Sequence, residues 1–281
     1  MQSMNANTRP PVSTALASHR WADLNTHDFA ALDPARTVAV LPLGATEQHG
    51  PHLPLSVDSV LVEGVVTAAL THLAATDPVL VLPTQTVGLS TEHTAFAGTL
   101  HLSPQTLIQV WCDMGASVAR AGVKKLLMFN AHGGHVGLMD VVARELRARH
   151  GLIVYSSSWY TLPLDASAMA QFPPDEHRFG IHAGDIETSM MLALSPERVN
   201  MTEAKNFAST SQERAKHYAI LGNGKSAKLG WHMQDYNPHG AAGNAAAATS
   251  AKGKALLHSA GEQLALLLKE LVDLPLSTVR V

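Results

Sequence analysis

Apolar runs of strand length alternate with amphipathic stretches of helical length from about residue 37 to residue 200. This alternation arises when each connection crosses one face of a parallel sheet and carries a helix. The pattern therefore predicts an α/β fold of three layers, α/β/α, in which helices cover both faces of a mostly parallel central sheet.

The expected strands are Thr37–Leu43, Pro78–Pro83, Lys124–Asn130 and Leu152–Ser157. The expected helices are Asp58–Ala75, Ser103–Gly122, Gly137–Arg149, Glu187–Leu194 and Ala251–Val272. Ser103 followed by Pro104 is a typical helix start, with serine as N-cap and proline at the first helical position. The stretch Leu221–Ala248 is rich in glycine, asparagine and alanine, and we expect it to be loop.

The chain has 281 residues, of which 46% are hydrophobic, so it can bury a substantial core. No composition shift or linker divides it after residue 20. We therefore expect a single domain over residues 21–281, preceded by a flexible tail over residues 1–20 that has no apolar run of signal-peptide type.

The formal charge of −3, from 20 basic and 23 acidic residues, gives no electrostatic reason to expect a nucleic acid or an anionic membrane as partner. No apolar run approaches the roughly 20 residues that a membrane helix needs. Cys112 is the only cysteine, which excludes an intramolecular disulfide and favours a cytoplasmic location.

Acidic residues and histidines follow the first expected strand, in the segment GATEQHGPHLPLSVD. Ligands of such folds bind beyond the carboxyl ends of the strands. Glu47 and His49, two residues apart in an extended loop, point the same way, and a short loop can return Asp58 to the same cavity. Carboxylate and imidazole ligands suit Zn²⁺, Mn²⁺ or Fe²⁺.

A histidine also follows the third expected strand, in the segment FNAHGGH. His132 lies two residues past the strand, and the two glycines after it permit unusual backbone torsions and close approach of a ligand. Read alone, the segment is equally compatible with a plain Gly-Gly turn. With Glu47, His49 and Asp58, His132 completes a metal site.

The segment GIHAGDIETSMML places further polar residues at the start of a helix. Asp185 is compatible with simple stabilisation of the helix dipole. Glu187 precedes an apolar run and is expected to point into the protein, where a glutamate must be paired or bound to a metal. We therefore assign Glu187 as a candidate fifth metal ligand.

Ser90, Glu92 and His93 follow the second strand and are candidate pocket residues, although Glu92 could equally serve as a helix cap or loop residue. Trp231 falls in the stretch expected to be loop, and we expect it at the surface.

Four motifs, taken together and in order, make the chain resemble the creatininase family: LPLGATEQHGPHLPLSVD, GLSTEH..FAGT, FNAHGGH and HAGDIETSMMLAL. The resemblance covers roughly Val38 to Asn200. It implies a creatininase-like α/β fold, two adjacent divalent ions (Zn, Mn or Fe) bridged by an aspartate, and a homo-oligomer that is a hexamer built as a trimer of dimers.

By this resemblance Asp58 bridges the two ions, Glu47 and His132 complete the site of one, and His49 binds the other. Creatininase has a further glutamate ligand two residues after the strand-end histidine. That position is Gly134 here, and Glu187 is the candidate replacement.

The resemblance also assigns pocket residues. His182 matches the family histidine that transfers a proton, and Trp159 matches a pocket tryptophan. The aromatic residue that follows the strand-end histidine is replaced by Gly133, and the tryptophan of the active-site loop by Arg178. These two departures argue against creatinine itself as the substrate.

The sequence thus predicts a metal-dependent amidohydrolase that uses a metal-activated hydroxide to cleave a non-peptide C–N bond of a small cyclic or linear amide. The catalytic residues are His182, as general acid, and Glu187. The substrate-binding residues are Ser90, Glu92, Gly133, Gly134, Trp159 and Arg178.

Three alternatives stay open: a formamidopyrimidine deformylase, a peptidase that trims a short peptide, and a non-catalytic metal-binding homologue. A phosphoesterase is disfavoured because Arg178 is the only cationic residue that these segments supply.

Overall fold

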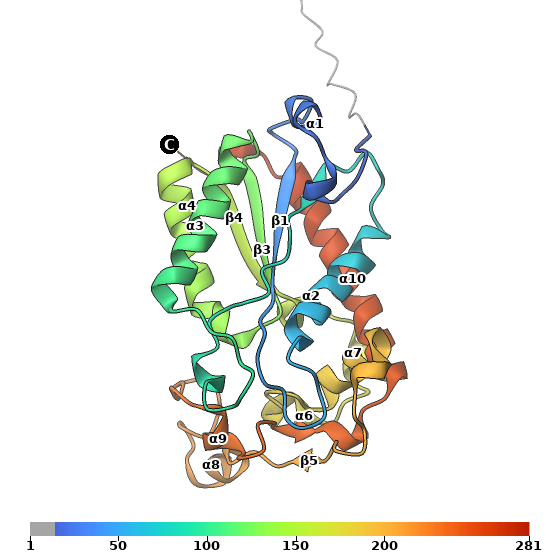
Figure 1. Cartoon of the computed structure of the whole chain (residues 1–281), viewed down its shortest axis with the longest axis vertical. Helices are drawn as coiled ribbons and strands as arrows, with labels where there is room; N and C mark the ends of the chain where they lie inside the picture. The colour runs from blue at the N-terminus through green and yellow to red at the C-terminus, as the bar shows by residue number, and fades with distance from the viewer. Residues whose placement is uncertain (1–14, 281) are drawn as a thin grey trace, which may run out of the picture.

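The structure is a computed structural model, and it describes residues 15–280 of the chain. Four parallel strands form the main sheet in the order β2-β1-β3-β4. The strands are β1 (Val38–Leu43), β2 (Val79–Val81), β3 (Lys125–Asn130) and β4 (Ile153–Ser158). In Figure 1 they run downward, so that their carboxyl ends point toward the lower third of the molecule.

The α-helices are α1 (Thr26–Ala30), α2 (Val57–Leu70), α3 (Pro104–Arg120), α4 (Val136–His150), α5 (Ala166–Met169), α6 (Pro174–Phe179), α7 (Asp185–Leu194), α8 (Ser211–His217), α9 (Met233–Tyr236) and α10 (Ser250–Asp273). The 3-10 helices are η1 (Trp21–Asp23), η2 (Thr91–His93), η3 (Gly133–His135), η4 (Trp159–Thr161), η5 (Pro196–Arg198), η6 (Ala245–Ala247) and η7 (Leu276–Thr278). A second, two-stranded antiparallel sheet pairs β5 (Asn206–Phe207) with β6 (Gly243–Asn244).

The main sheet is covered on both faces, and alternate residues of each strand pack against different helices. In β1, Val38 and Val40 belong to a core shared with α2, α7 and α10. Ala39 and Leu41 belong to a second core shared with α3 and α4. Since successive side chains of a strand point to opposite faces, this division produces the predicted three-layer α/β/α fold (Figure 1).

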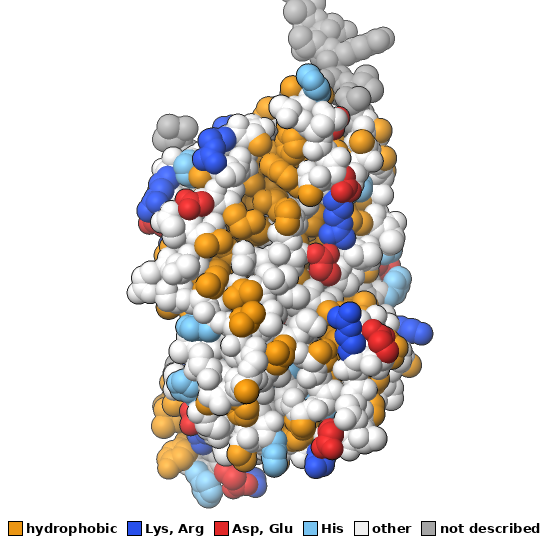
Figure 2. Space-filling model, in the orientation of Figure 1, with side chains coloured by type: hydrophobic (Ala, Val, Ile, Leu, Met, Phe, Trp, Pro, Cys, Tyr) orange, Lys and Arg blue, Asp and Glu red, His pale blue; other side chains and the backbone are white. Residues whose placement is uncertain are grey.

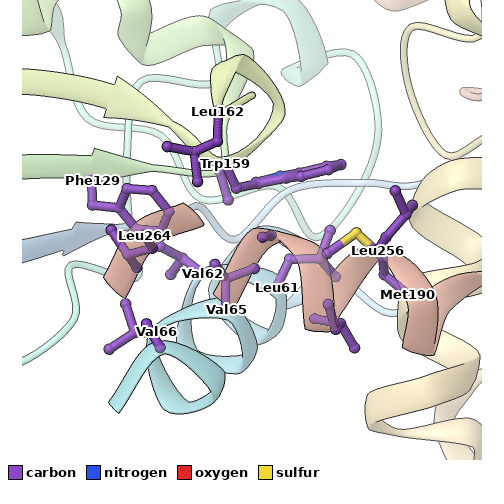
Figure 3. Close-up of a cluster of buried hydrophobic side chains, with 14 of the residues drawn as sticks. Leu61, Val62, Val65, Val66, Phe129, Trp159, Leu162, Met190, Leu256 and Leu264 are labelled. Atoms are coloured by element: carbon purple, nitrogen blue, oxygen red, sulfur yellow. The ribbon is translucent and has the colours of Figure 1, made fainter. Parts of the chain in front are cut away.

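Figure 3 shows the larger of the two cores, where side chains of α2 and α10 meet the sheet. Leu61, Val65 and Leu264 lie between the two helices and the strand that carries Phe129. The ring of Trp159 extends from the end of β4 across this cluster. The core therefore reaches the carboxyl edge of the sheet and supports the residues placed there.

Two segments differ from their expected form. The stretch Leu221–Ala248 is mostly irregular, as expected, but it also contains α9, β6 and η6. Of the expected tail, residues 1–14 lie outside the described residues. From Leu16 onward the chain packs on the domain, because Leu16 N–H donates to Ala75 and Val81 N–H donates to His19.

Charged side chains are scattered singly or in small groups over the face shown in Figure 2, and hydrophobic side chains form a band across its upper half. Within residues 15–280, no helix combines the length and the apolar character that crossing a membrane requires.

A buried lysine joins the sheet to the end of the last helix. Lys125 begins β3 and has no exposed surface. Its Nζ donates to the carbonyl oxygens of Leu271 (2.7 Å) and Val272 (2.8 Å), in the last turn of α10. The final carbonyls of a helix have no partner within the helix, so this lysine satisfies them and holds α10 on the sheet.

We predict that Lys125→Met lowers the free energy of unfolding by about 1–3 kcal/mol, because it leaves buried carbonyls without a donor. Lys269 is the matched control, since its Nζ donates to the His72 carbonyl (2.9 Å) at an exposed site. Urea unfolding of Lys125→Met and Lys269→Met measures the difference. Equal losses in the two variants would contradict this role of Lys125.

Candidate metal centre

The loop after β1 turns back on itself and brings Asp58 beside Glu47. Glu47 N–H donates to the Leu55 carbonyl (2.9 Å), which closes the loop just before α2 begins. The start of α2 lies directly against Gly44, where a Cβ would come within 2.7 Å of the Ser59 backbone. Asp58 therefore stands in the first turn of α2 with its carboxylate at the strand end.

Glu47, Asp58 and His132 form one group of ligand atoms, and all three residues are buried. His132 Nδ1 lies 3.2 Å from Glu47 Oε1 and 3.5 Å from Asp58 Oδ2. These atoms lie within 4.8 Å of one another, which is close enough to share one cation.

A second group lies on the other side of Asp58. His49 Nε2 is 3.6 Å from Asp58 Oδ1 and 3.9 Å from Glu187 Oε2. Asp58 thus turns one carboxylate oxygen toward His132 and the other toward His49. An aspartate in this position can contribute to two adjacent cation sites.

Backbone carbonyls fix the orientation of both histidines. His49 Nδ1 donates to the Glu47 carbonyl (3.0 Å), and His132 Nε2 donates to the Leu89 carbonyl (2.7 Å). The nitrogen left over in each ring faces the carboxylates. Histidines that bind metals are usually held in this way, by a hydrogen bond from their second nitrogen.

The inward-facing atoms fit a cation, and several of them have no hydrogen bond. Both carboxylate oxygens of Glu47, Nε2 of His49 and Oδ2 of Asp58 are buried without a hydrogen bond. They lie close together but outside hydrogen-bond geometry, an arrangement that suits ligands around a shared ion. Buried polar groups without partners are costly, and divalent cations would satisfy all of them.

Electrostatics in this cluster are strong. Burial on its own lowers the pKa of a histidine, but Asp58 outweighs it and raises the pKa of His49 to about 9. In the same way Glu47 raises the pKa of His132 to about 10. Each histidine must lose its proton to bind a cation, so cation binding releases protons and is favoured by rising pH.

His182 lies against the cluster on a tight turn before α7. Its ring stacks between those of His49 and His93, at centroid distances of 4.1 and 4.3 Å. Its Nε2 donates to the Gln48 carbonyl (2.8 Å), and burial holds the pKa of the ring well below its usual range. Ala183 follows with φ of +53°, a torsion that non-glycine residues rarely adopt. Its N–H donates to Glu187 Oε2 (2.6 Å), so the turn fixes both residues.

These groups open into a cavity of about 430 Å³ at the carboxyl edge of the sheet. The cavity is lined by most of the site residues predicted from the sequence, namely Glu47, Asp58, Glu92, His132, Gly133, Gly134, Trp159, His182 and Glu187. His49 lies behind them, fully buried against Asp58.

Two expected substrate-binding residues are placed elsewhere. Ser90 is fully buried and does not line the cavity; its backbone N–H donates to His101. Arg178 faces a neighbouring hollow, where its guanidinium lies 4.8 Å from the Phe179 ring centroid. Arg178 lies on α6, and its side chain points away from the metal cavity.

His93, Glu176 and Trp231 are among the other residues that line the cavity. His93 Nε2 lies 3.3 Å from Glu47 Oε1, and Trp231 stands edge-on to the His93 ring. Glu176 accepts backbone N–H groups of Asp185 (2.7 Å) and Asn244 (2.9 Å), so it holds the start of α7. His93 followed from its motif, but Glu176 and Trp231 stand in segments that give no local signal of burial at a site.

Gly134 is the position at which the family resemblance implies a glutamate, and a side chain there would meet close neighbours. A Cβ at Gly134 would lie 2.5 Å from His132 Nε2 and from Glu92 Oε1, and 2.6 Å from the Leu89 carbonyl. Glu92 lies on the outer side of His132, 3.8 Å from the nitrogen that faces away from the cluster. Glu187 lies on the inner side, beside His49.

We predict that Gly134→Ala lowers the free energy of unfolding by about 1–3 kcal/mol through overpacking, and also reduces bound metal. Gly133→Ala is the matched control, because its Cβ would meet nothing within 4 Å. Thermal unfolding and elemental analysis of both variants check the prediction. If the two alanines behaved alike, the packing at Gly134 would not be what shapes the site.

Comparison with known proteins identifies the family. The family described as creatininase, creatinine amidohydrolase, matches residues 22–268. The chain therefore belongs to the creatininase family.

Two kinds of relative share about a third of their aligned residues with this chain. The mycofactocin precursor peptide peptidase of Mycobacterium tuberculosis is 34% identical over 166 residues, 57% of this chain and 59% of that protein. The creatinine amidohydrolase of Pseudomonas putida is 32% identical over 177 residues, 58% of this chain and 66% of that protein. The matches thus span about three-fifths to two-thirds of these relatives.

Solved creatininases share the fold. One superimposes with a TM-score of 0.74 and 24% identity, covering 92% of this chain and 99% of its own. Two further solved creatininases are described as a mutant of Zn–Zn type and as a Mn form. At this identity the likeness establishes the three-layer fold.

Proposed function

We propose that this chain is an amidohydrolase that depends on two divalent metal ions, such as Zn²⁺, Mn²⁺ or Fe²⁺, and cleaves a C–N bond of a small amide. The observation that carries the proposal is the position of Asp58, which turns one oxygen toward each of two histidines. Family membership supports the same conclusion.

One ion would be held by Glu47, Asp58 and His132, and the other by His49, Asp58 and Glu187. Ions bound there polarise an amide carbonyl and lower the pKa of a water molecule. Glu187 takes the role of the glutamate that the family has at the position of Gly134, since Glu187 lies on the inner side of the cluster.

The chain itself supplies positioning and proton transfer. His182 can accept a proton on Nδ1 and return it to the departing nitrogen, because Gln48 holds its other nitrogen. Gly133 and Gly134 bring bare backbone to the cavity, and Trp159 and Tyr160 provide aromatic walls. Glu92 lines the cavity and stays a candidate substrate contact.

The substrate is a small amide, and two classes follow from the relatives. A non-peptide amide corresponds to the creatinine amidohydrolase. Cleavage of a short peptide corresponds to the peptidase, at slightly higher identity. Gly133 and Arg178 stand where creatininase has aromatic residues, and this departure favours a substrate other than creatinine.

We also propose, from the family resemblance, a homo-oligomer built as a trimer of dimers. The single cysteine leads us to propose a cytoplasmic location.

The function is tested by amide hydrolysis after removal and return of metal. We predict that protein reloaded with Zn²⁺ or Mn²⁺ hydrolyses at least one of creatinine, simple formamides and short peptides, measured as ring opening for creatinine and as release of an amine for the linear amides, and that stripped protein does not. His182→Ala should lose at least about 100-fold in turnover, the usual contribution of a general acid or base, while keeping its metal. Near wild-type turnover in this variant would remove His182 from proton transfer.

A further inference from the structure

A second hollow of about 240 Å³ lies beside the metal cavity. It is formed by the end of α6, by α8, by the segment 221–229 and by Tyr236 at the end of α9. Thr210 N–H donates to the Tyr236 carbonyl (3.0 Å), which ties α8 to α9 at the lower end of the molecule (Figure 1).

Trp231 is a wall of both spaces. One contact of its ring is with His93, edge-on at 6.1 Å in the metal cavity, and another is with Tyr236, at 5.1 Å in the hollow. Trp231 therefore lies where the metal cavity and the hollow adjoin.

The hollow is lined by three cationic side chains, those of Arg178, Arg214 and Lys228. Two are held in place: Arg178 Nη2 donates to the Gly222 carbonyl (3.4 Å), and the Arg214 guanidinium lies 4.8 Å from the Tyr236 ring centroid. Among residues 15–280, none of the three cations forms an ion pair.

Nearby carboxylates do not neutralise these cations. Glu213, on α8, pairs with Lys216 at 2.6 Å. Asp235, on α9, accepts the backbone N–H of His232 (2.8 Å). The three cations, which have no ion pair among the described residues, thus gather positive charge around one small space, and such a space attracts an anion. The planar forks of the two arginines suit a carboxylate.

The metal cavity has the opposite character. Its lining carries five carboxylates, those of Glu47, Asp58, Glu92, Glu176 and Glu187. Three of them are proposed metal ligands, but Glu92 and Glu176 are not. The two divalent ions of the proposed function would offset the charge of the three ligands, so the preference of a substrate carboxylate for the hollow rests on Arg178, Arg214 and Lys228.

We propose that the hollow binds a carboxylate of the substrate, so that the preferred substrate is an amide or short peptide with a free carboxylate beyond the bond that is cleaved. This inference rests on the proposed function for the position of that bond. It assigns Arg178 and Arg214 to substrate selection rather than to the chemical step.

The test compares N-formyl dipeptides that end in a carboxylate with the same dipeptides ending in a carboxamide. Binding by calorimetry and formate release are measured on metal-loaded protein. We expect the carboxylate form to bind at least about tenfold more tightly, equivalent to about 1.4 kcal/mol. Arg214→Gln and Arg178→Gln should remove the preference, and Lys228→Gln should reduce it.

Arg144→Gln is the matched control, because Arg144 is an exposed arginine on α4, paired with Asp140. It should keep the full preference. Equal binding of the two forms by wild type, no binding of either form, or a preference that survives Arg178→Gln and Arg214→Gln would overturn the inference. Hydrolysis of both forms without preference would leave the proposed function standing. Arginine-dependent binding of the carboxylate form without hydrolysis would leave the hollow standing and remove the proposed function for this substrate class.

Discussion

The structure depends on one electrostatic constraint: Glu47, Asp58, His49 and His132 are almost completely buried, at 1–3% exposure, and several of their inward-facing atoms have no hydrogen bond. Burying such groups without partners is costly. The outward-facing ring nitrogens of the two histidines donate to fixed backbone carbonyls, as His132 does to Leu89. Under the proposed function, two ions that share Asp58 would satisfy these atoms, and the cavity, the turn at Ala183 and the start of α7 lie around them.

The fold supplies this arrangement by combining rigid strands with short returns of the chain. The loop after β1 is closed by the hydrogen bond from Glu47 to Leu55, and α2 then carries Asp58 back to the strand end. On the opposite side, the buried ion pair of Asp185 with Lys252 (2.6 Å) fixes α7 to α10. Glu187 is therefore held on the sheet's carboxyl edge by the largest core of the molecule.

Much of this could be predicted from the sequence, because the signals are local. Apolar runs indicated the four strands, and Glu47, His49, Asp58 and His132 stand in motifs directly after strands. Glu176 and Trp231 could not be predicted, since they reach the cavity through tertiary packing of segments whose composition indicates surface or loop. Arg178 shows the limit of transferring a role by family resemblance. Its position corresponds to a substrate-pocket residue of the family, but its side chain faces the hollow beside the metal cavity. The roles of the individual site residues stay predictions.

The most direct test is the metal content of purified protein after supplementation with Zn²⁺ or Mn²⁺, measured by elemental analysis. The account predicts about two ions per chain in wild type, both lost in Asp58→Ala. It further predicts about one ion in Glu187→Gln and an unchanged content in Glu92→Gln. A wild-type chain without metal, or an Asp58→Ala variant that keeps both ions, would contradict the shared two-ion centre. Loss of metal from Glu92→Gln but not from Glu187→Gln would mean that Glu92, and not Glu187, replaces the family glutamate as a metal ligand.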